Sequence, residues 1–247
     1  MDDKVTGDCG CCGNGNPGDD PKPLPHWSYS GPTGPEYWGD LDPGFSVAKT
    51  GHQQSPIDLA GPFDSGAERI FFTYQVTPLN VTNNGHSIQV DCPPGNSISI
   101  GGRRYELLQY HFHTPSEHTA DGKYYGMELH LVHQSDQGQF AVVGVFMKAG
   151  NTHSSLADIW DLMPDQVGNS VSSEVMIDPT DFLPTDRRNV QYDGSLTTPP
   201  CSEDVVWTMM LEPISVSPEQ IEQFKKVIGQ NNRPVQPLND RVLRYGA

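Results

Sequence analysis

Two histidines, His111 and His113, are separated by a single residue in a segment whose side chains alternate as in a β-strand. Successive side chains of a strand point to opposite faces, so both imidazoles would lie on one face together with Gln109. The opposite face would carry Leu108, Tyr110 and Phe112. Because neutral imidazole is a common metal ligand, this spacing indicates a metal site.

A second segment, residues 127–134, repeats the alternation and would place Glu128, His130 and Val132 on one face. If the two strands are neighbours, His130 converges on the first two imidazoles. Three histidines with an open fourth position are the ligand set of catalytic rather than structural zinc. Gln109 and Glu128 are acceptors for the other ring N–H groups, an interaction that fixes ring orientation and tautomer.

The order His-x-His followed by Glu117 also occurs in cupin barrels, which bind iron or manganese through two histidines, a glutamate and a later histidine. Cupins carry a Pro-x-Gly-x-x-His pattern in their second half, whereas Gly-Met-Glu-Leu precedes His130 here. A cupin-type metal oxygenase is therefore the less favoured alternative. Other histidines are interpreted as ordinary hydrogen-bonded side chains, namely His26, His52, His118, His133 and His153.

Short segments of alternating or β-branched residues, separated by turn residues, would form the strands that position these side chains. They cover residues 87–91, 97–100, 106–114, 127–134, 140–148 and 205–211. Since an all-β domain of this length need not divide, the pattern predicts one large, mostly β domain of the α+β class.

Two helices are predicted, one over residues 154–162 and one after Ser217. Ser217 is suited to cap the second helix, Pro218 fits its first position and Gln220 completes a capping box. An apolar stripe for packing follows, made of Ile221, Phe224, Val227 and Ile228.

The chain has 247 residues and a formal net charge of −16 at pH 7. This charge repels polyanions, so nucleic acid and anionic membrane surfaces are excluded as partners. No stretch approaches the roughly 20 apolar residues that span a bilayer, and the N-terminus lacks a secretory signal. The sequence is interpreted as the mature form of a periplasmic or secreted protein whose signal peptide has been removed, with a cytoplasmic location as the open alternative.

Residues 1–25 are rich in Gly, Asp and Pro and predict a flexible acidic tail, followed by a folded domain over residues 26–247. Three of the five cysteines, Cys9, Cys11 and Cys12, lie in this tail. Free or disulfide-bonded thiols are favoured there over a zinc clip, because no second ligand pair stands at the spacing of a structural zinc site. Cys92 and Cys201 are interpreted as inert buried thiols.

From His26 to about Tyr245 the sequence resembles the alpha-class carbonic anhydrases, in their bacterial form. The matching runs are His-Trp-Ser-Tyr at 26–29, Gly-Pro-Glu-Tyr-Trp at 34–38, Gln-Gln-Ser-Pro-Ile at 53–57, Asn-Asn-Gly-His at 83–86, residues 109–118, residues 128–133, Ser-Leu-Thr-Thr-Pro-Pro at 195–200 and Arg-Pro-Val-Gln-Pro-Leu at 233–238. The resemblance implies a single domain on a large central, mainly antiparallel twisted sheet with a few peripheral helices.

The resemblance also implies reversible hydration of carbon dioxide to bicarbonate by zinc-bound hydroxide, with incidental esterase activity. His111, His113 and His130 would be the zinc ligands, with Gln109 and Glu128 as acceptors for the first and third rings. Thr197 would orient the hydroxide and donate its own proton to Glu117, because an ionised carboxylate can only accept.

His86 would be the proton shuttle, since an imidazole with a pKa near 6.5 suits that relay. Tyr29, Asn84 and, more weakly, Gln89 would hold the relay waters. The substrate pocket would consist of Val132, Val142, Leu196, Thr198, Val205 and Trp207. Sulfonamides and anions are the expected inhibitors. A non-catalytic binding module that keeps this fold is the alternative of a different class.

Two departures from the family have consequences. The cysteine that usually precedes the Gln-Ser-Pro run is replaced near Ala48 and Lys49, so Cys201 is hypothesised to pair with a tail cysteine instead. The connection from His133 to Phe140 is short, as in bacterial members. By family analogy, this widens the active-site mouth and opens a surface for a homodimer.

Overall fold

The structure is a computed structural model that describes residues 26–246. Its strands are β1 (Asp58–Leu59), β2 (Asp64–Ser65), β3 (Ile70–Thr73), β4 (Thr77–Asn83), β5 (Ile88–Asp91), β6 (Ser97–Ile100), β7 (Arg103–His113), β8 (Thr119–Ala120), β9 (Met127–Gln134), β10 (Phe140–Ala149), β11 (Ser170–Ile177), β12 (Asn189–Gly194), β13 (Val205–Val216) and β14 (Arg244–Gly246). Its helices are α1 (Trp38–Leu41), α2 (Val47–Thr50), α3 (Ser154–Asp161) and α4 (Pro218–Ile228), with short 3-10 turns at Gly31–Thr33, Pro43–Phe45 and Pro179–Phe182.

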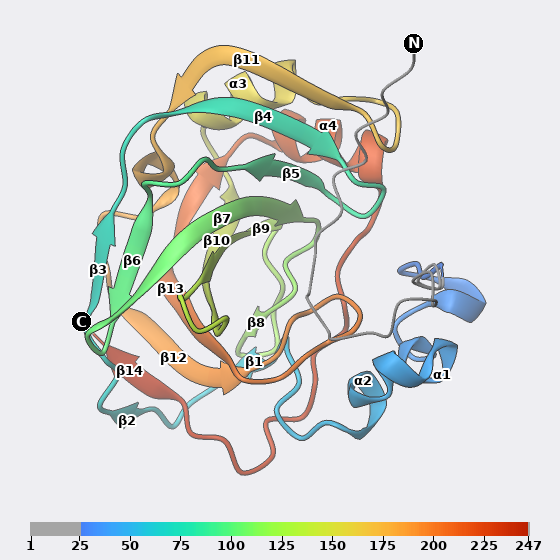
Figure 1. Ribbon diagram of the computed structural model, residues 1–247, viewed down its shortest axis with the longest axis vertical. Helices are drawn as coiled ribbons and strands as arrows, with labels where there is room; N and C mark the ends of the chain where they lie inside the picture. Colours follow the sequence, from blue (N-terminus) through green and yellow to red (C-terminus); the bar gives the residue numbers. More distant parts are fainter. Residues whose placement is uncertain (1–25, 247) are drawn as a thin grey trace, which may run out of the picture.

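One strongly curved sheet of 12 strands dominates the fold, with the order β11-β4-β5-β7-β9-β10-β13-β12-β14-β2, and β3 and β6 attached beside β7 (Figure 1). Most neighbours are antiparallel, while β10–β13 and β14–β2 are parallel. The short strands β1 and β8 form a separate parallel pair. The predicted mostly β fold on a mainly antiparallel, twisted sheet with few helices is confirmed.

The two strands that carry the candidate ligands are central neighbours, and α3 and α4 lie together at another side of the sheet from α1 and α2 (Figure 1). The longest helix of the described residues, α4, has 11 residues, and none of the helices there is long and apolar enough to cross a membrane. Residues 1–25, including the predicted tail and Cys9, Cys11 and Cys12, lie outside the described residues.

Strand β7 departs from simple alternation at one position. The β7–β9 register shifts between Leu107 and Gln109, which indicates a bulge at Leu108. Leu107 is buried, whereas Leu108 is 39% exposed. The prediction that Leu108 shares a face with Tyr110 and Phe112 is therefore wrong, because the extra residue of a bulge interrupts the alternation.

The remainder of β7 alternates as predicted and is held from behind by helices. Phe112, between the two histidines in sequence, points to the opposite face and lies 4.8 Å, centroid to centroid, from Trp160 of α3. Trp160 in turn stacks on Phe224 of α4 at 5.4 Å. The capping box that Ser217 and Gln220 were predicted to form begins α4. The helices thus bury the apolar face of the strand and turn its histidines to the other side.

Candidate metal centre

The imidazoles of three histidines meet between β7 and β9. His111 and His130 are direct partners in the antiparallel register. With His113 they present ring nitrogens that all lie within 4.8 Å of one another. This spacing suits three ligands of one ion rather than three mutually hydrogen-bonded rings.

Each ring is fixed in one tautomer by the partner of its other nitrogen. His111 Nδ1 lies 2.8 Å from Gln109 Oε1, and His113 Nδ1 lies 2.7 Å from the carbonyl oxygen of Asn231. His130 Nε2 lies 2.7 Å from Glu128 Oε1. All three partners accept, so these nitrogens carry the protons. Nε2 of the first two rings and Nδ1 of the third are left as lone pairs.

The surroundings keep the rings neutral and leave an atom for an ion to bind. Burial, followed by the neighbouring rings, lowers the pKa of His111 well below its usual value, and burial also lowers that of His113. His113 Nε2 is buried and has no hydrogen-bond partner. An orphaned lone pair that faces two others is what a zinc ion would satisfy, so the residues present fit the metal.

Glu128 is fully buried and accepts four hydrogen bonds. Its Oε2 accepts from the backbone N–H groups of Glu117 at 3.0 Å and His118 at 2.8 Å. Its Oε1 accepts from His118 Nδ1 and His130 Nε2, each at 2.7 Å. Burial alone would raise the pKa of Glu128, but these two histidines outweigh it and hold the pKa far below its usual value. Glu128 therefore acts as an ionised acceptor that orients His130.

His118, Glu128 and His130 also lie close enough together to suggest a second metal group. Their facing atoms are already paired, because Glu128 accepts from both rings. His118 Nε2 lies 2.6 Å from the hydroxyl of Tyr192. This cluster is a hydrogen-bonded support for the first site rather than a site of its own.

Glu117 lies beside the three histidines with one oxygen paired and one free. Its Oε1 accepts from the backbone N–H of Arg233 at 2.7 Å. Its Oε2 is buried without a donor and lies 3.6 Å from His113 Nε2. Thr197 is buried and lines a pocket together with His111 and His130, but it forms no hydrogen bond with Glu117 in the structure. Their pairing stays a prediction, and Glu117 Oε2 is the acceptor that it requires.

A pocket of about 510 Å³ opens beside the metal-facing side of β7 and β9. It brings together ten of the predicted site residues, namely Gln89, Gln109, His111, His130, Val132, Val142, Leu196, Thr197, Thr198 and Trp207. Val205 is buried in the same small core as the pocket residues Val132, Val142 and Trp207 but does not itself line the pocket, so its role in the pocket stays a prediction. Asp91, Leu108, Gln134 and Phe140 complete the lining and were not predicted.

His86 lies outside this lining, in the turn that follows β4. Its ring stacks on Trp27 with centroids 3.6 Å apart and an interplanar angle of 8°. Burial, and next the charge of His26, lowers the pKa of His86 below its usual value. Tyr29 is edge-on to His86 at 6.5 Å, and Asn84 accepts from the His86 backbone N–H at 2.9 Å. The predicted relay residues are therefore grouped around one turn.

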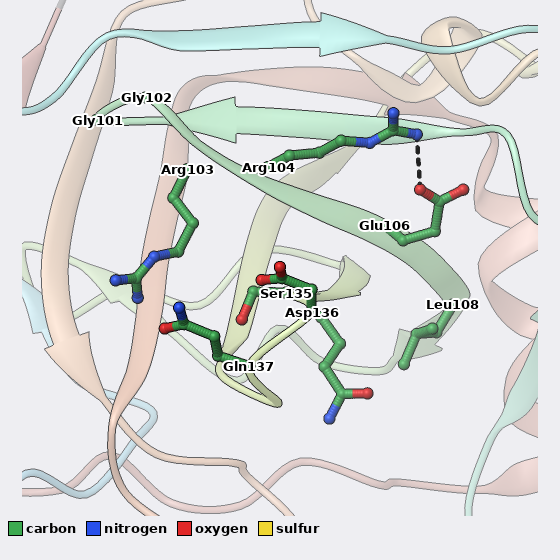
Figure 2. Close-up of a pocket in the computed structure, with 10 residues that line it drawn as sticks. Gly101, Gly102, Arg103, Arg104, Glu106, Leu108, Ser135, Asp136 and Gln137 are labelled. Carbon is green, nitrogen blue, oxygen red and sulfur yellow. Dashed lines mark hydrogen bonds and ion pairs between the residues drawn. The ribbon is translucent and has the colours of Figure 1, made fainter.

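A larger hollow, of about 740 Å³, lies at the other end of β7 (Figure 2). Figure 2 shows Arg104 reaching Glu106, at 2.7 Å, with Arg103 and Asp136 across the hollow. Two arginines and two acids balance one another there, and the lining contains no imidazole. Its polar groups do not converge on one point as they do at the three histidines.

Several residues that support the site were not predicted. Asn231 holds His113 through its carbonyl oxygen and donates from its side chain to the carbonyl oxygen of His86 at 2.9 Å. Arg233 holds Glu117, and His118 was interpreted as an ordinary side chain. The conspicuous Arg-Pro-Val-Gln-Pro-Leu run at 233–238 was the available signal for this segment.

Cys92 and Cys201 are free among the described residues, and burial raises the pKa of Cys201 to about 11. The hypothesised partners of Cys201 lie outside the described residues, so that pairing stays a prediction.

Comparison with known proteins shows that the chain is similar to the members of one family. It matches the model of eukaryotic-type carbonic anhydrases over residues 33–247. A carbonic anhydrase of Nostoc is 46% identical over 224 residues, which cover 88% of this chain and 85% of that protein. One of Neisseria gonorrhoeae is 40% identical over 220 residues, covering 88% and 87%. The structure of the Thermovibrio ammonificans alpha-carbonic anhydrase with sulfanilamide has a TM-score of 0.87 and 44% identity, covering 89% of this chain and 99% of that one.

Proposed function

This chain belongs to the eukaryotic-type, or alpha, carbonic anhydrase family, and from this premise we propose that it hydrates carbon dioxide reversibly at a zinc ion held by His111, His113 and His130. It is an enzyme, a lyase of the carbonic anhydrase type. The observation that carries the zinc proposal is the set of three converging lone pairs, each fixed by a partner on the opposite ring nitrogen. The cupin and non-catalytic alternatives have no comparable support.

Zinc held by the three rings would supply Lewis acidity, which in carbonic anhydrases lowers the pKa of a coordinated water to about 7, and would so make a nucleophile available at neutral pH. We propose that Thr197 orients this nucleophile. If the Thr197 hydroxyl donates to Glu117 Oε2, which lacks a donor, its own lone pair faces the reacting oxygen. Glu117 cannot rotate freely, because the Arg233 N–H holds its other oxygen.

Carbon dioxide is uncharged, so an apolar wall beside the histidines suits it better than a charged one. Val132, Val142, Leu196 and Trp207 supply that wall in the pocket. The reaction adds water to carbon dioxide and gives bicarbonate and one proton. We propose that the proton leaves through His86, whose ring has a pKa low enough to release it again near neutral pH.

Removal of the metal tests the central proposal. We expect stopped-flow measurements to show carbon dioxide hydration by the purified protein, loss of most of that activity after treatment with a zinc chelator, and recovery when one equivalent of zinc is returned. Elemental analysis before treatment should give about one zinc per chain. Activity that survives complete zinc removal, or iron or manganese in place of zinc, would contradict the proposal.

Replacing the shuttle tests the route of the proton. In His86→Ala, we expect turnover in weak buffer to fall by roughly tenfold or more, because a positioned acid–base group is lost. The kcat/KM for carbon dioxide should stay near that of the parent, and added imidazole should restore turnover. His52→Ala, which removes an exposed histidine elsewhere, is the matched control. An unchanged rate in weak buffer would discard the role of His86.

We also propose several finer properties of the protein. The Thermovibrio relative was solved with the inhibitor sulfanilamide, which supports sulfonamide binding at this pocket. Inhibition by anions, a periplasmic or secreted location, a homodimer and the division into a tail and one domain remain proposals from the sequence.

A further inference from the structure

We propose that Asp91, at the rim of the metal pocket, is a positioning residue that sets the direction of a hydrogen-bond chain through Gln89 and Asn84 to the turn that carries His86. The inference rests on the proposed function in one respect, since it takes His86 to be the group that exports the proton. Asp91 was not among the predicted site residues.

The chain of contacts runs along β5, beside the ligand-bearing strand β7. Gln89 is the register partner of His111, and Asp91 is the partner of Gln109. Gln89 Nε2 donates to Asp91 Oδ1 at 2.6 Å, and Asn84 Nδ2 lies 3.3 Å from Gln89 Oε1. These hydrogen bonds therefore connect the pocket rim to the turn that follows β4.

Asn84 connects Gln89 to the backbone of the turn that carries His86. Its Oδ1 accepts from the N–H groups of His86 at 2.9 Å and Ser87 at 2.8 Å. The other side of the turn is held by Asn231, whose side chain donates to the His86 carbonyl oxygen at 2.9 Å. The position of His86 is thus set from two sides, one of them through Asn84.

The direction of every bond in this chain follows from its two ends. The carboxylate of Asp91 can only accept, so Gln89 must offer its N–H group there and its oxygen to Asn84. The backbone N–H groups of the turn can only donate, so Asn84 must offer its oxygen there and its N–H group to Gln89. Both ends require the same orientation of both amides. Asp91 is the fixed acceptor at the pocket end of the chain, so it holds the Gln89 amide where its oxygen meets the Asn84 N–H group.

Asp91 is itself held from behind. Asn80 Nδ2, on the neighbouring strand β4, lies 3.4 Å from Asp91 Oδ2, and Ser172 Oγ on β11 donates to Asn80 Oδ1 at 3.1 Å. Asp91 is partly buried and lines the pocket. Its carboxylate is therefore confined between two strands and aimed along β5, rather than free in solvent as most surface acids are.

The test compares two substitutions of Asp91 that differ in one property. Asp91→Leu removes the acceptor, whereas Asp91→Asn removes the charge but keeps an oxygen that Gln89 can use. Asp136→Leu, which removes an exposed acid of the β9–β10 turn, is the matched control. The readouts are kcat in weak buffer, kcat in concentrated imidazole and kcat/KM, all by stopped-flow carbon dioxide hydration of the zinc-loaded enzyme.

For Asp91→Leu we expect kcat in weak buffer to fall about fivefold, the factor that corresponds to the net contribution of one hydrogen bond. Imidazole should restore kcat, and kcat/KM should not change, because proton export follows the release of bicarbonate. Asp91→Asn and Asp136→Leu should keep the parent values. A merely structural role for Asp91 would instead lower kcat and kcat/KM together.

Three results would overturn the inference. The first is an unchanged kcat of Asp91→Leu in weak buffer when the kcat of His86→Ala is lowered. This result leaves the proposed function intact and removes only the role of Asp91. The second is an equal loss in Asp91→Asn and Asp91→Leu, which means that the charge rather than the hydrogen-bond direction matters. The third is a kcat of His86→Ala in weak buffer equal to that of the parent protein. This result removes the role of His86 as shuttle and the inference with it.

Discussion

His113→Ala is expected to lose its bound zinc and to lower kcat/KM by about a thousandfold, the factor that corresponds to the several kcal/mol a metal ion contributes to such a reaction. His113 is fully buried, and its Nε2 is an orphaned lone pair in the group of three ring nitrogens. Two remaining histidines cannot complete a tetrahedral zinc site that also keeps one position open. Elemental analysis and stopped-flow hydration measure the two losses on the same sample.

The substitution also removes the partner of the Asn231 carbonyl oxygen, so we expect the free energy of unfolding to fall by about 1–3 kcal/mol. His111→Ala is the companion variant, because among residues 26–246 the only hydrogen bond that its ring makes is to Gln109 at the pocket. We expect the same loss of zinc and activity with an unfolding midpoint closer to that of the parent protein. His52→Ala should keep both zinc and activity. Full zinc occupancy in both ligand variants would contradict the assignment of the centre.

The part of this centre that sequence reasoning could predict is local. His111 and His113 share a face because alternation holds over residues 109–113, and the same rule applied to residues 127–134 places Glu128 and His130 together. Alternation alone does not predict that these two strands are neighbours in the sheet. The structure shows that they are, because β7 and β9 pair antiparallel with His111 opposite His130.

The parts that were missed depend on contacts between distant segments. Asn231 holds His113 across a separation of 118 residues, and Arg233 holds Glu117 across 116. No periodicity connects such positions, and the backbone groups used at both carry no information about residue type. The bulge at Leu108 was missed for another reason, since one added residue changes which face a side chain occupies without changing the apolar pattern around it.

Asp91 illustrates the same limit at the pocket rim. Its spacing from Gln89 places both side chains on one face of β5, which alternation predicts. That this face borders the metal pocket follows only from the pairing of β5 with β7. The sequence alone suggests a solvent-exposed acid at this position, whereas the fold confines Asp91 as a hydrogen-bond acceptor.

The second large effect is expected for Glu128→Gln. An amide offers one oxygen in place of two, while four N–H groups point at this side chain, from the backbones of Glu117 and His118 and from the rings of His118 and His130. Whichever way the amide turns, its NH₂ group faces donors and at least one of them is left unpaired in the interior. Because a buried donor loses its partner, we expect the free energy of unfolding to fall by about 1–3 kcal/mol.

Glu128→Gln should also weaken zinc binding by about 10- to 100-fold, because His130 loses the acceptor that fixes its ring and its metal-facing lone pair. Denaturant unfolding of the zinc-free protein measures the first effect, and competition with a chelator of known affinity measures the second. Glu222→Gln, which changes an exposed acid 3.8 Å from Lys225, is the control and should alter the unfolding free energy by less than about 0.5 kcal/mol. A stable Glu128→Gln protein with parental zinc affinity would mean that the buried carboxylate is protonated in the native enzyme, since a neutral acid can donate one hydrogen bond just as the amide does. The four short contacts to N–H donors argue against that state, because a protonated oxygen would face a donor in place of the lone pair that each of them requires.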